Sequence, residues 1–257
     1  MTQAGRESRV LAALVSLVDS LLDDFDVVEL LTQLTERCAE LLDIASAGLL
    51  LADSRGQLHL MAATTQGTHD LELFQLHHDE GPCLECYATG EGVNVSNLSA
   101  ETGRWPQFAP AAIKAGFAAV HAVPMRAGAT VVGALNLFGS TVGALDPADL
   151  LVGQTLAHIA TVAILQRDAP APDTVLPQLQ RALASRVVVE QATGFLRERM
   201  DVSITEAFDT LRRYAHANSD HLTDVARTLM SDRSRRQQVL TRMTQMPAER
   251  TSVTPHG

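Results

Sequence analysis

The chain has 257 residues, 46% of them hydrophobic, and this length allows one large domain or two modest ones. Its mean hydropathy of +0.06 is that of an ordinary soluble protein, which excludes a bundle of membrane-spanning helices. The net charge at pH 7 is −10, with −13 on residues 1–175 and +3 on residues 176–257, so any binding of nucleic acid must use a small, defined patch.

The N-terminal sequence gives no sign of a secretory signal. It carries charges of both signs and is followed by amphipathic sequence instead of an unbroken apolar core. The segment 127–145 has no charged residue over 19 positions, close to the length that suggests a membrane span. It contains four glycines and alternates like strand and turn, so we interpret it as core sequence. We expect a cytoplasmic protein that does not bind a membrane.

Two helices are predicted first, at residues 6–22 and 26–43. In the second, Asp26 and Glu29 resemble a capping arrangement, and apolar residues then recur at helical spacing. A third long helix is predicted from Asp146-Pro147 to about residue 166, because Asp is a good cap and Pro suits the first helical position.

Short apolar runs between these helices predict strands. The turn-forming run 53–56 joins the first two in a hairpin. The predicted strands are residues 45–52, 57–64, 92–95, 117–124 and 129–139. Helical or polar segments separate them at residues 68–76, 82–88 and 108–115. Together with the long helices they predict an α+β domain with an antiparallel sheet and flanking helices.

This order of elements resembles the GAF fold, and the run DEGPCLECYATGEGVNVSNL at residues 79–98 resembles the GAF domains of bacterial regulators. The resemblance implies a sensor domain over residues 1–167, with a pocket between the sheet and the intervening helices. Domains of this kind bind a small-molecule ligand, bind haem or another chromophore, or serve only in dimerisation, and the residues leave these alternatives open.

Reactive chemistry is sparse in the predicted sensor domain. Cys83 and Cys86 have the CxxC spacing of redox and metal sites, but a four-cysteine zinc site needs a second pair, and Cys38 is the only other cysteine. A CxxC at a helix N-terminus can still have a lowered thiol pKa. Four histidines could ligate a metal or haem only if they met in space: His69, His77, His78 and His121. We expect no metal and no cofactor.

The sequence contains no recognisable catalytic motif, so we expect no enzyme activity. No pair of carboxylates, no Ser/His/Asp spacing and no glycine-rich phosphate loop after a strand stands out.

Residues 168–177 are rich in proline and predict a short, stiff linker, which puts the domain boundary near residue 168.

The segment from Leu179 to Met230 predicts three consecutive helices. The first runs over residues 179–200 and has two lines of apolar residues. Ser203 with Glu206 forms a capping box for the second, which should end at residues 218–220. Thr223 is predicted to cap the third, and residues 237–257 are predicted to form a polar tail.

Three runs in this segment, SRVVVEQATGFL, EAFDTLRRYA and LTDVA, resemble in that order the ANTAR domain, the RNA-binding module of bacterial transcription antiterminators. The resemblance implies an all-α three-helix bundle over residues 178–236. It also implies a dimer that binds paired hairpins in leader transcripts. The RNA-binding residues implied by the family pattern and its surroundings are Arg186, Gln191, Thr193, Gly194, Arg212, Arg213 and Tyr214.

Two departures from the family pattern remove positive charge. Thr193 stands where the family often has Lys, and the loop at residues 218–221 lacks Lys and Arg. Both positions belong to a surface expected to meet phosphate, so each remaining arginine should matter more. Arg212 and Arg213 point in different directions around their helix, and the family pattern favours Arg213.

These observations predict an RNA-binding transcription antitermination regulator in which a GAF sensor domain controls a dimeric ANTAR domain. A homodimer is expected because the helices at residues 6–43, 147–166 and 179–200 offer more apolar surface than one sheet and one small bundle can cover. Two alternatives stay open. One is a dimeric ligand-sensing or interaction scaffold without RNA binding, and the other is a GAF-fold thiol-dependent methionine sulfoxide reductase.

Overall fold

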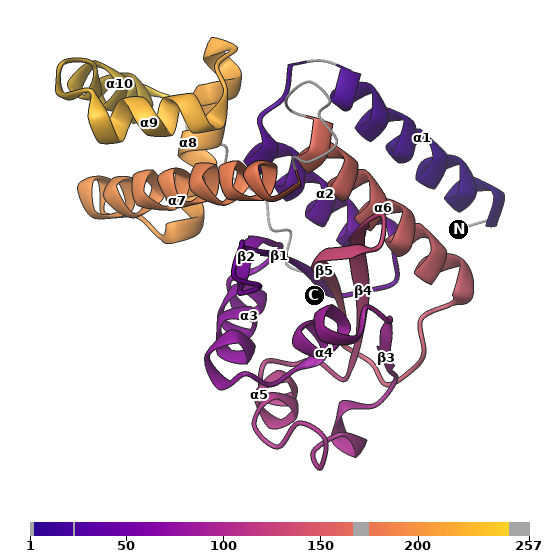
Figure 1. The fold of residues 1–257 in the computed structure, drawn as a ribbon. Helices are drawn as coiled ribbons and strands as arrows, with labels where there is room; N and C mark the ends of the chain where they lie inside the picture. The colour runs from indigo at the N-terminus through magenta and orange to yellow at the C-terminus, as the bar shows by residue number, and fades with distance from the viewer. Residues whose placement is uncertain (1–2, 23, 167–174, 247–257) are drawn as a thin grey trace, which may run out of the picture. The chain divides into compact units, whose positions relative to one another are not determined.

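The computed structural model describes residues 3–22, 24–166 and 175–246. Its backbone divides into two compact units, unit 1 at residues 1–186 and unit 2 at residues 187–257 (Figure 1). Most of the predicted linker, residues 168–174, and the end of the predicted tail, residues 247–257, lie outside the described residues.

Unit 1 is built on a five-stranded antiparallel sheet, as predicted, with strand order β2-β1-β5-β4-β3. The central strands are almost wholly buried because both sheet faces are covered, and β1 is buried along its whole length. The strands are β1 (Ser46–Ala52), β2 (Leu58–Ala63), β3 (Val93–Val95), β4 (Ala119–Ala127) and β5 (Thr130–Gly139). The uncharged segment 127–145 contains β5, so its interpretation as core sequence is confirmed for the buried residues 132–138 of this strand, whereas residues 140–144 after it are exposed.

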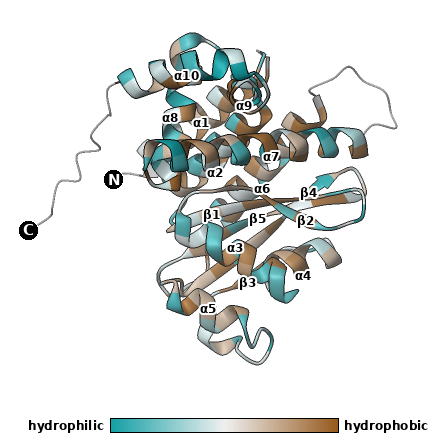
Figure 2. Ribbon diagram, turned by 90° about the vertical axis from the view of Figure 1, so that its left-hand side faces the viewer, coloured by the Kyte–Doolittle hydropathy of each residue, from teal (hydrophilic) through white to brown (hydrophobic). Residues whose placement is uncertain are grey.

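Helices cover both faces of the sheet (Figure 2). On one face lie α2 (Val27–Leu41) and α6 (Pro147–Gln166), and α1 (Gln3–Leu22) packs on these two helices. On the other face lie α3 (Gln66–His78), α4 (Pro82–Thr89) and α5 (Phe108–Lys114). A short 3-10 turn, Leu98–Ala100, follows β3. A large apolar cluster that includes Phe108 and Phe138 fills the layer between the sheet and these three helices, where the resemblance implied a sensor pocket.

Local sequence signals explain where the helices of unit 1 begin. Asp26 caps α2 by accepting hydrogen bonds from the backbone N–H groups of Val28 and Glu29 at 2.9 and 3.2 Å, which confirms the predicted cap. Asp146 does the same for α6 by accepting from Ala148 N at 2.8 Å.

The helix α6 is apolar for a structural reason. Its stretch Pro147–Leu165 has a mean hydropathy of 1.5 and is the one helix of the described residues that is long and apolar enough to cross a membrane. By composition alone such a helix can also be the core helix of a globular domain. Here α6 packs against β4, β5 and α2, and 44% of the stretch is buried.

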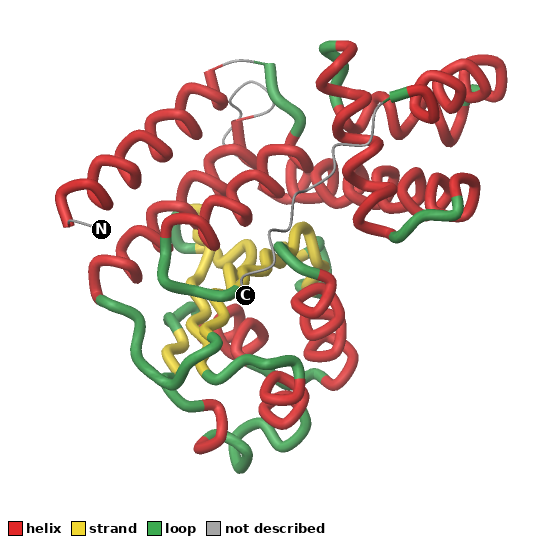
Figure 3. The backbone as a smooth tube through the Cα atoms, turned by 180° about the vertical axis from the view of Figure 1, so that it is seen from behind, coloured by secondary structure: helices red, strands yellow, loops and turns green. Residues whose placement is uncertain are grey.

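Unit 2 consists, over its described residues, of helices joined by short turns (Figure 3). The helices are α7 (Val175–Met200), α8 (Ile204–Asn218), α9 (Leu222–Ser231) and α10 (Arg233–Gln245). The predicted capping box of α8 is present, since Ser203 Oγ accepts from Glu206 N and the Glu206 carboxylate accepts from Ser203 N. The end of α8 is also as predicted, with Ser219 in the left-handed conformation at a φ of 55°.

One prediction about this region differs from the structure. Thr223 is not the cap of α9, because the helix begins at Leu222 after His221, and the Thr223 side chain is fully buried inside the first turn. The two compact units divide inside α7, between residues 186 and 187. Gln178 in the first turns of α7 donates to Leu165 O at 2.6 Å, and Leu179 and Ala182 are buried, so these turns belong to unit 1.

The largest difference is α10, which occupies part of the predicted polar tail. Asp232 caps this helix by accepting from the N–H groups of Ser234 and Arg235 at 3.0 and 3.1 Å. Val239, Leu240 and Met243 are buried and pack α10 against α8 and α9. These three apolar residues form a narrow stripe in an otherwise polar sequence, which is why no sustained apolar period is visible there.

Candidate functional site

The exposed face of α7 in unit 2 is a stripe of residues at helical spacing. Val187, Gln191, Gly194 and Glu198 all face solvent at positions i, i+4, i+7 and i+11. The opposite side, with Val189, Ala192 and Leu196, is fully buried in the bundle. The predicted site residues Gln191 and Gly194 therefore lie together on one accessible surface.

Gly194 is not required by packing against any residue that the structure describes. A Cβ atom built at this position meets nothing within 4 Å, and the backbone is that of an ordinary helix. Glycine inside a helix costs about 1 kcal/mol relative to alanine. A glycine with open space around it and such a cost is consistent with a surface where another molecule must come close to the helix backbone.

Thr193 does not face solvent as the prediction required. Its side chain is 5% exposed and its hydroxyl donates to Val189 O at 2.8 Å. The reason is spacing, because residue 193 is four positions after Val189 and three before Leu196, both of which are in the bundle core. We therefore remove Thr193 from the contact surface.

Tyr214 also differs from the prediction. It is 5% exposed and shares the buried side of α8 with Ala207, Leu211 and Ala215. The same apolar spacing that predicted α8 places Tyr214 in its core, and this burial leaves little of the side chain accessible to RNA.

Arg212 and Arg213 are both half-buried on α8. The Arg213 guanidinium lies along its own helix, where Nη2 donates to Thr210 Oγ1 at 3.2 Å and Nε donates to Asp209 O at 3.4 Å. The side chain is thus held in place at a surface position. Arg186 is half-buried too and lies on α7, five residues before Gln191.

Unit 1 contains a buried polar cluster in the layer between the sheet and α3. Glu72 of α3 accepts hydrogen bonds from Asn136 Nδ2 of β5 at 2.9 Å to Oε1 and 3.1 Å to Oε2. Gln75 Nε2 donates to Glu72 Oε2, and Gln75 Oε1 accepts from Cys83 N at 3.3 Å. All three polar side chains are fully buried.

This cluster is electrostatically costly. Burial raises the pKa of Glu72 to about 8, although the hydrogen bonds from Asn136 and Gln75 oppose that shift. Asn136 Oδ1 is buried without a hydrogen-bond partner in the described structure. Gly48 of β1 is required here, because a Cβ atom at that position would overlap Glu72 Oε1 and lie 2.9 Å from its Cδ.

The thiols of the CxxC pair are poorly suited to nucleophilic chemistry. Cys83 and Cys86 are buried free cysteines, and burial raises the pKa of both, that of Cys86 to about 12. The negative charge of Glu72 adds to the shift of the Cys83 pKa. The lowering that a helix N-terminus can give is therefore outweighed by burial.

The described residues contain no group of three or more His, Cys, Asp or Glu side chains placed to hold a metal ion. Of the four histidines considered, His77 and His78 neighbour each other on α3, with ring centroids 6.2 Å apart. His121 lies buried on β4, where its Nδ1 contacts Asn94 Oδ1 at 3.2 Å, and burial lowers its pKa.

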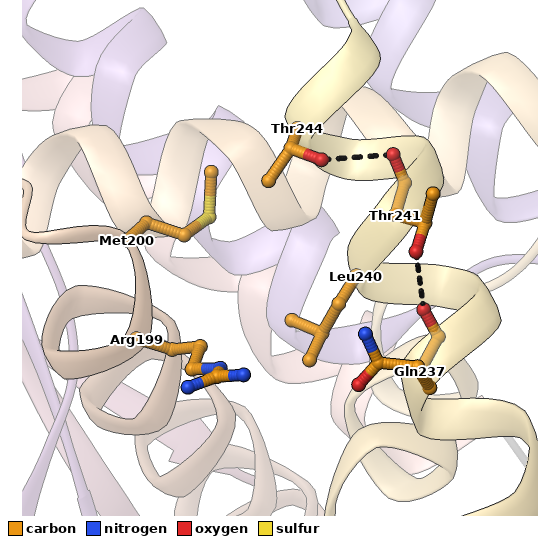
Figure 4. A pocket seen from close by; sticks show the side chains of 6 residues that line it. All are labelled: Arg199, Met200, Gln237, Leu240, Thr241 and Thr244. Carbon is orange, nitrogen blue, oxygen red and sulfur yellow. Dashed lines mark hydrogen bonds between the residues drawn. The ribbon is translucent and has the colours of Figure 1, made fainter.

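A pocket of about 460 Å³ lies in unit 2 between the end of α7 and α10. Figure 4 shows the side chains of α10 along one side and Arg199 and Met200 of α7 on the other. Its lining residues are Arg199, Met200, Gln237, Leu240, Thr241 and Thr244.

Sequence reasoning missed the buried cluster and α10. The cluster had a visible signal, because Glu72 and Gln75 are three residues apart on one helix, and Asn136 interrupts an apolar strand. Which strand and which helix would meet could not be read from the sequence.

Comparison with protein families finds two domains in the chain. The model of the GAF domain matches residues 26–165, and the model of the ANTAR domain matches residues 177–230. No curated protein matches the chain.

Several solved structures are similar to unit 1. The GAF domain of an Acinetobacter phosphoenolpyruvate-protein phosphotransferase matches with a TM-score of 0.49 and 18% identity, covering 64% of this chain and 95% of that one. The GAF domain of the Coxiella burnetii phosphoenolpyruvate-protein phosphotransferase gives 0.45 and 18%, with coverage of 61% and 92%. A free methionine-R-sulfoxide reductase from Neisseria meningitidis gives 0.45 and 18%, with coverage of 66% and 89%. These values carry no conclusion about activity or ligand.

Proposed function

The chain belongs to the GAF-domain family and carries an ANTAR domain after it, and from this premise we propose that it is a cytoplasmic RNA-binding transcription antitermination regulator. In this proposal the GAF domain receives a signal and controls the ANTAR domain, which binds paired hairpins in leader transcripts. The observation that carries the proposal is the exposure of Gln191 and Gly194 on one side of α7, since no described residue lies within 4 Å of a Cβ atom built at Gly194. Arg213, half-buried on α8, supplies the nearby positive charge in the proposal.

The proposal assigns separate roles to the two arginines of α8. Arg213, held by Thr210, contacts RNA, whereas Arg212 points about 100° away around the helix. Arg213→Ala should weaken binding of the full chain to a two-hairpin leader RNA and, if the contact is to phosphate, lower the salt slope by about 1. Arg212→Ala is the matched control, since it removes the same charge from the neighbouring position.

Binding is measured for both variants and the wild type at several salt concentrations, with leader RNAs of the organism's own genome. Near-wild-type affinity of both variants would remove Arg213 from the site. Failure of the wild-type chain to bind any of these RNAs would favour a dimeric scaffold that lacks RNA binding.

We further propose that the regulator is a homodimer whose contact surface includes α1. Leu11, Val15 and Val18 are 64%, 59% and 45% exposed and follow each other at spacings of four and three residues. This spacing is that of a helix seam that pairs with another helix. Leu11→Glu with Val15→Glu should convert the dimer to the 27.6 kDa monomer in light scattering. Leu73→Glu with Val142→Glu, which places charges on exposed apolar residues elsewhere in unit 1, should leave the dimer intact.

No enzymatic role is proposed. A thiol-dependent reductase needs an accessible thiolate, and burial raises the pKa of Cys38 and Cys86 to about 12 and shifts that of Cys83 in the same direction. A turnover assay with free methionine sulfoxide and a thiol reductant checks this, and sustained turnover would contradict the proposal.

A further inference from the structure

The charge of the C-terminal region is concentrated in one helix. Residues 177–230, which match the ANTAR domain, contain seven arginines and seven carboxylates and so have a net charge of zero. The helix α10 contains four arginines and no carboxylate. We propose, on the basis of the RNA-binding function above, that α10 is a second RNA-contacting element that binds backbone phosphates beyond the ANTAR domain.

One of the four arginines holds α10 in place. Arg236 donates through Nη2 to Met230 O at 2.7 Å and through Nε to Leu229 O, which are carbonyls at the end of α9. Its guanidinium also lies 5.3 Å from the centroid of the Phe195 ring. With Val239, Leu240 and Met243 buried, α10 is a packed part of the bundle and presents its remaining charges on a fixed support.

The other three arginines form what we call the α10 cationic surface: Arg233, Arg235 and Arg242. All three are exposed. Arg233 and Arg242 have no ion pair or hydrogen bond within the described part of the chain, and Arg235 has one exposed contact, Nε to Asp232 Oδ2 at 3.6 Å. Such exposed pairs are weak, so Arg235 can exchange Asp232 for a phosphate.

The three arginines of the α10 cationic surface lie on two different flanks of the helix. Arg235 and Arg242 are seven residues apart and lie on the same flank, about 10 Å apart along the helix axis. Arg233 lies one turn before Gln237 on α10, and Gln237 lines the pocket together with Arg199 (Figure 4). Thr241 and Thr244 donate their hydroxyls to their own helix, which leaves Arg199 and Gln237 as the donors of this pocket. The pocket thus places one further cation, Arg199 at the end of α7, beside α10.

The chemistry of this surface fits RNA better than a lipid bilayer. The large apolar side chains of α10 are buried in the bundle, and its described residues expose none that could enter a membrane. Guanidinium groups bind phosphate oxygens without reading sequence, so this contact would add affinity while the ANTAR surface selects the hairpins. The phosphate contact through α10 also explains how an ANTAR domain of zero net charge can bind RNA, which is a polyanion.

The test uses the full chain with Arg233, Arg235 and Arg242 all changed to Gln. The matched control changes three exposed basic residues of unit 1, Arg37, Arg55 and Lys114, to Gln and alters the net charge equally. Binding is measured against two RNAs, a two-hairpin leader RNA and a short RNA duplex of random sequence, between low and moderate salt. Circular dichroism confirms that each variant remains folded.

The α10 variant should lose affinity for both RNAs, on the order of ten- to a hundredfold at low salt, and its salt slope should fall by about 2 to 3. The control should match the wild type. An unchanged slope and affinity in the α10 variant, with hairpins still bound, would overturn the inference and leave the proposed function standing. Salt-dependent binding of the duplex through α10 without preference for hairpins would support the inference and count against the proposed function. No binding of either RNA by the wild type would overturn both.

Discussion

The two units place their polar groups in opposite ways. In unit 1 the notable polar side chains, Glu72, Gln75 and Asn136, are fully buried and bonded to one another. In unit 2 the notable ones are arginines at the surface of α8 and α10. Changes in the first region should therefore act through stability and its dependence on pH, whereas changes in the second should act through binding and its dependence on salt.

The largest effect on stability should come from the carboxyl group of Glu72. Its pKa is about 8 in the folded chain and near 4.5 when unfolded, so the unfolded chain releases this proton first as the pH rises. Below pH 4.5 the carboxyl is neutral in both the folded and the unfolded chain, so it adds no pH dependence. Between about pH 4.5 and 8 the free energy of unfolding should fall by up to about 1.4 kcal/mol per pH unit, because only the unfolded chain has released the proton. Glu72→Gln should remove this slope and stabilise unit 1 at pH 8.

The chain offers a direct reporter for this measurement. Trp105 is the single tryptophan and is 4% exposed in unit 1, so its fluorescence follows the unfolding of that unit in denaturant. Glu91→Gln, at a side chain that is 84% exposed, is the control and should keep the wild-type pH dependence. An equal pH slope in Glu72→Gln and in the wild type would show that Glu72 does not carry a raised pKa.

The next effect compares two glycines of unit 1, one packed against the buried cluster and one with open space around it. Gly48→Ala should destabilise unit 1 by about 1 to 3 kcal/mol, because the new Cβ atom overlaps the buried Glu72 carboxyl and forces the cluster apart. Denaturant unfolding followed by Trp105 fluorescence measures this change. Gly103→Ala, where a Cβ atom meets nothing within 4 Å, should change stability far less. Equal effects of the two substitutions would contradict the contact between Gly48 and Glu72.

Gly194→Ala should have the smallest effect on stability. It should stabilise the protein, whereas Gly48→Ala should destabilise it. Alanine is favoured over glycine inside a helix, so α7 should be stabilised by up to about 1 kcal/mol, seen as slower amide hydrogen exchange. RNA affinity should nevertheless fall, because the methyl group stands on the proposed contact surface. Gln180→Ala, at an exposed position of the same helix, should leave RNA affinity unchanged. Tighter or equal RNA binding by Gly194→Ala would separate Gly194 from the interface.

Sequence patterns predicted unit 1 element by element because its signals are local. Asp26, Asp146 and the turn at residues 53–56 mark boundaries through contacts with their own neighbours. The Glu72 cluster was not predictable in the same way, because it joins α3 to β5 across 64 residues. Its existence depends on the sheet order, which brings β1 and β5 together under α3.

The predicted RNA surface was only partly consistent with the structure for a related reason. Gln191, Gly194, Arg212 and Arg213 are accessible, whereas Thr193 and Tyr214 are buried. A family pattern marks positions without saying whether each faces a partner or the core, and helical spacing alone would have placed Thr193 and Tyr214 inside. The helix α10 was missed because three apolar residues suffice to bury it once Asp232 starts it and Arg236 fastens it to α9.

The central claim is that this chain prevents termination by binding leader RNA, and transcription in vitro tests it most directly. A leader template with two hairpins and a terminator is transcribed in a single round, with and without the full chain and with Arg213→Ala. The account predicts more read-through with the wild type, and less of this gain with Arg213→Ala than with Arg212→Ala. Unchanged read-through on every leader template of the organism's genome, at protein concentrations that saturate the RNA, would contradict it.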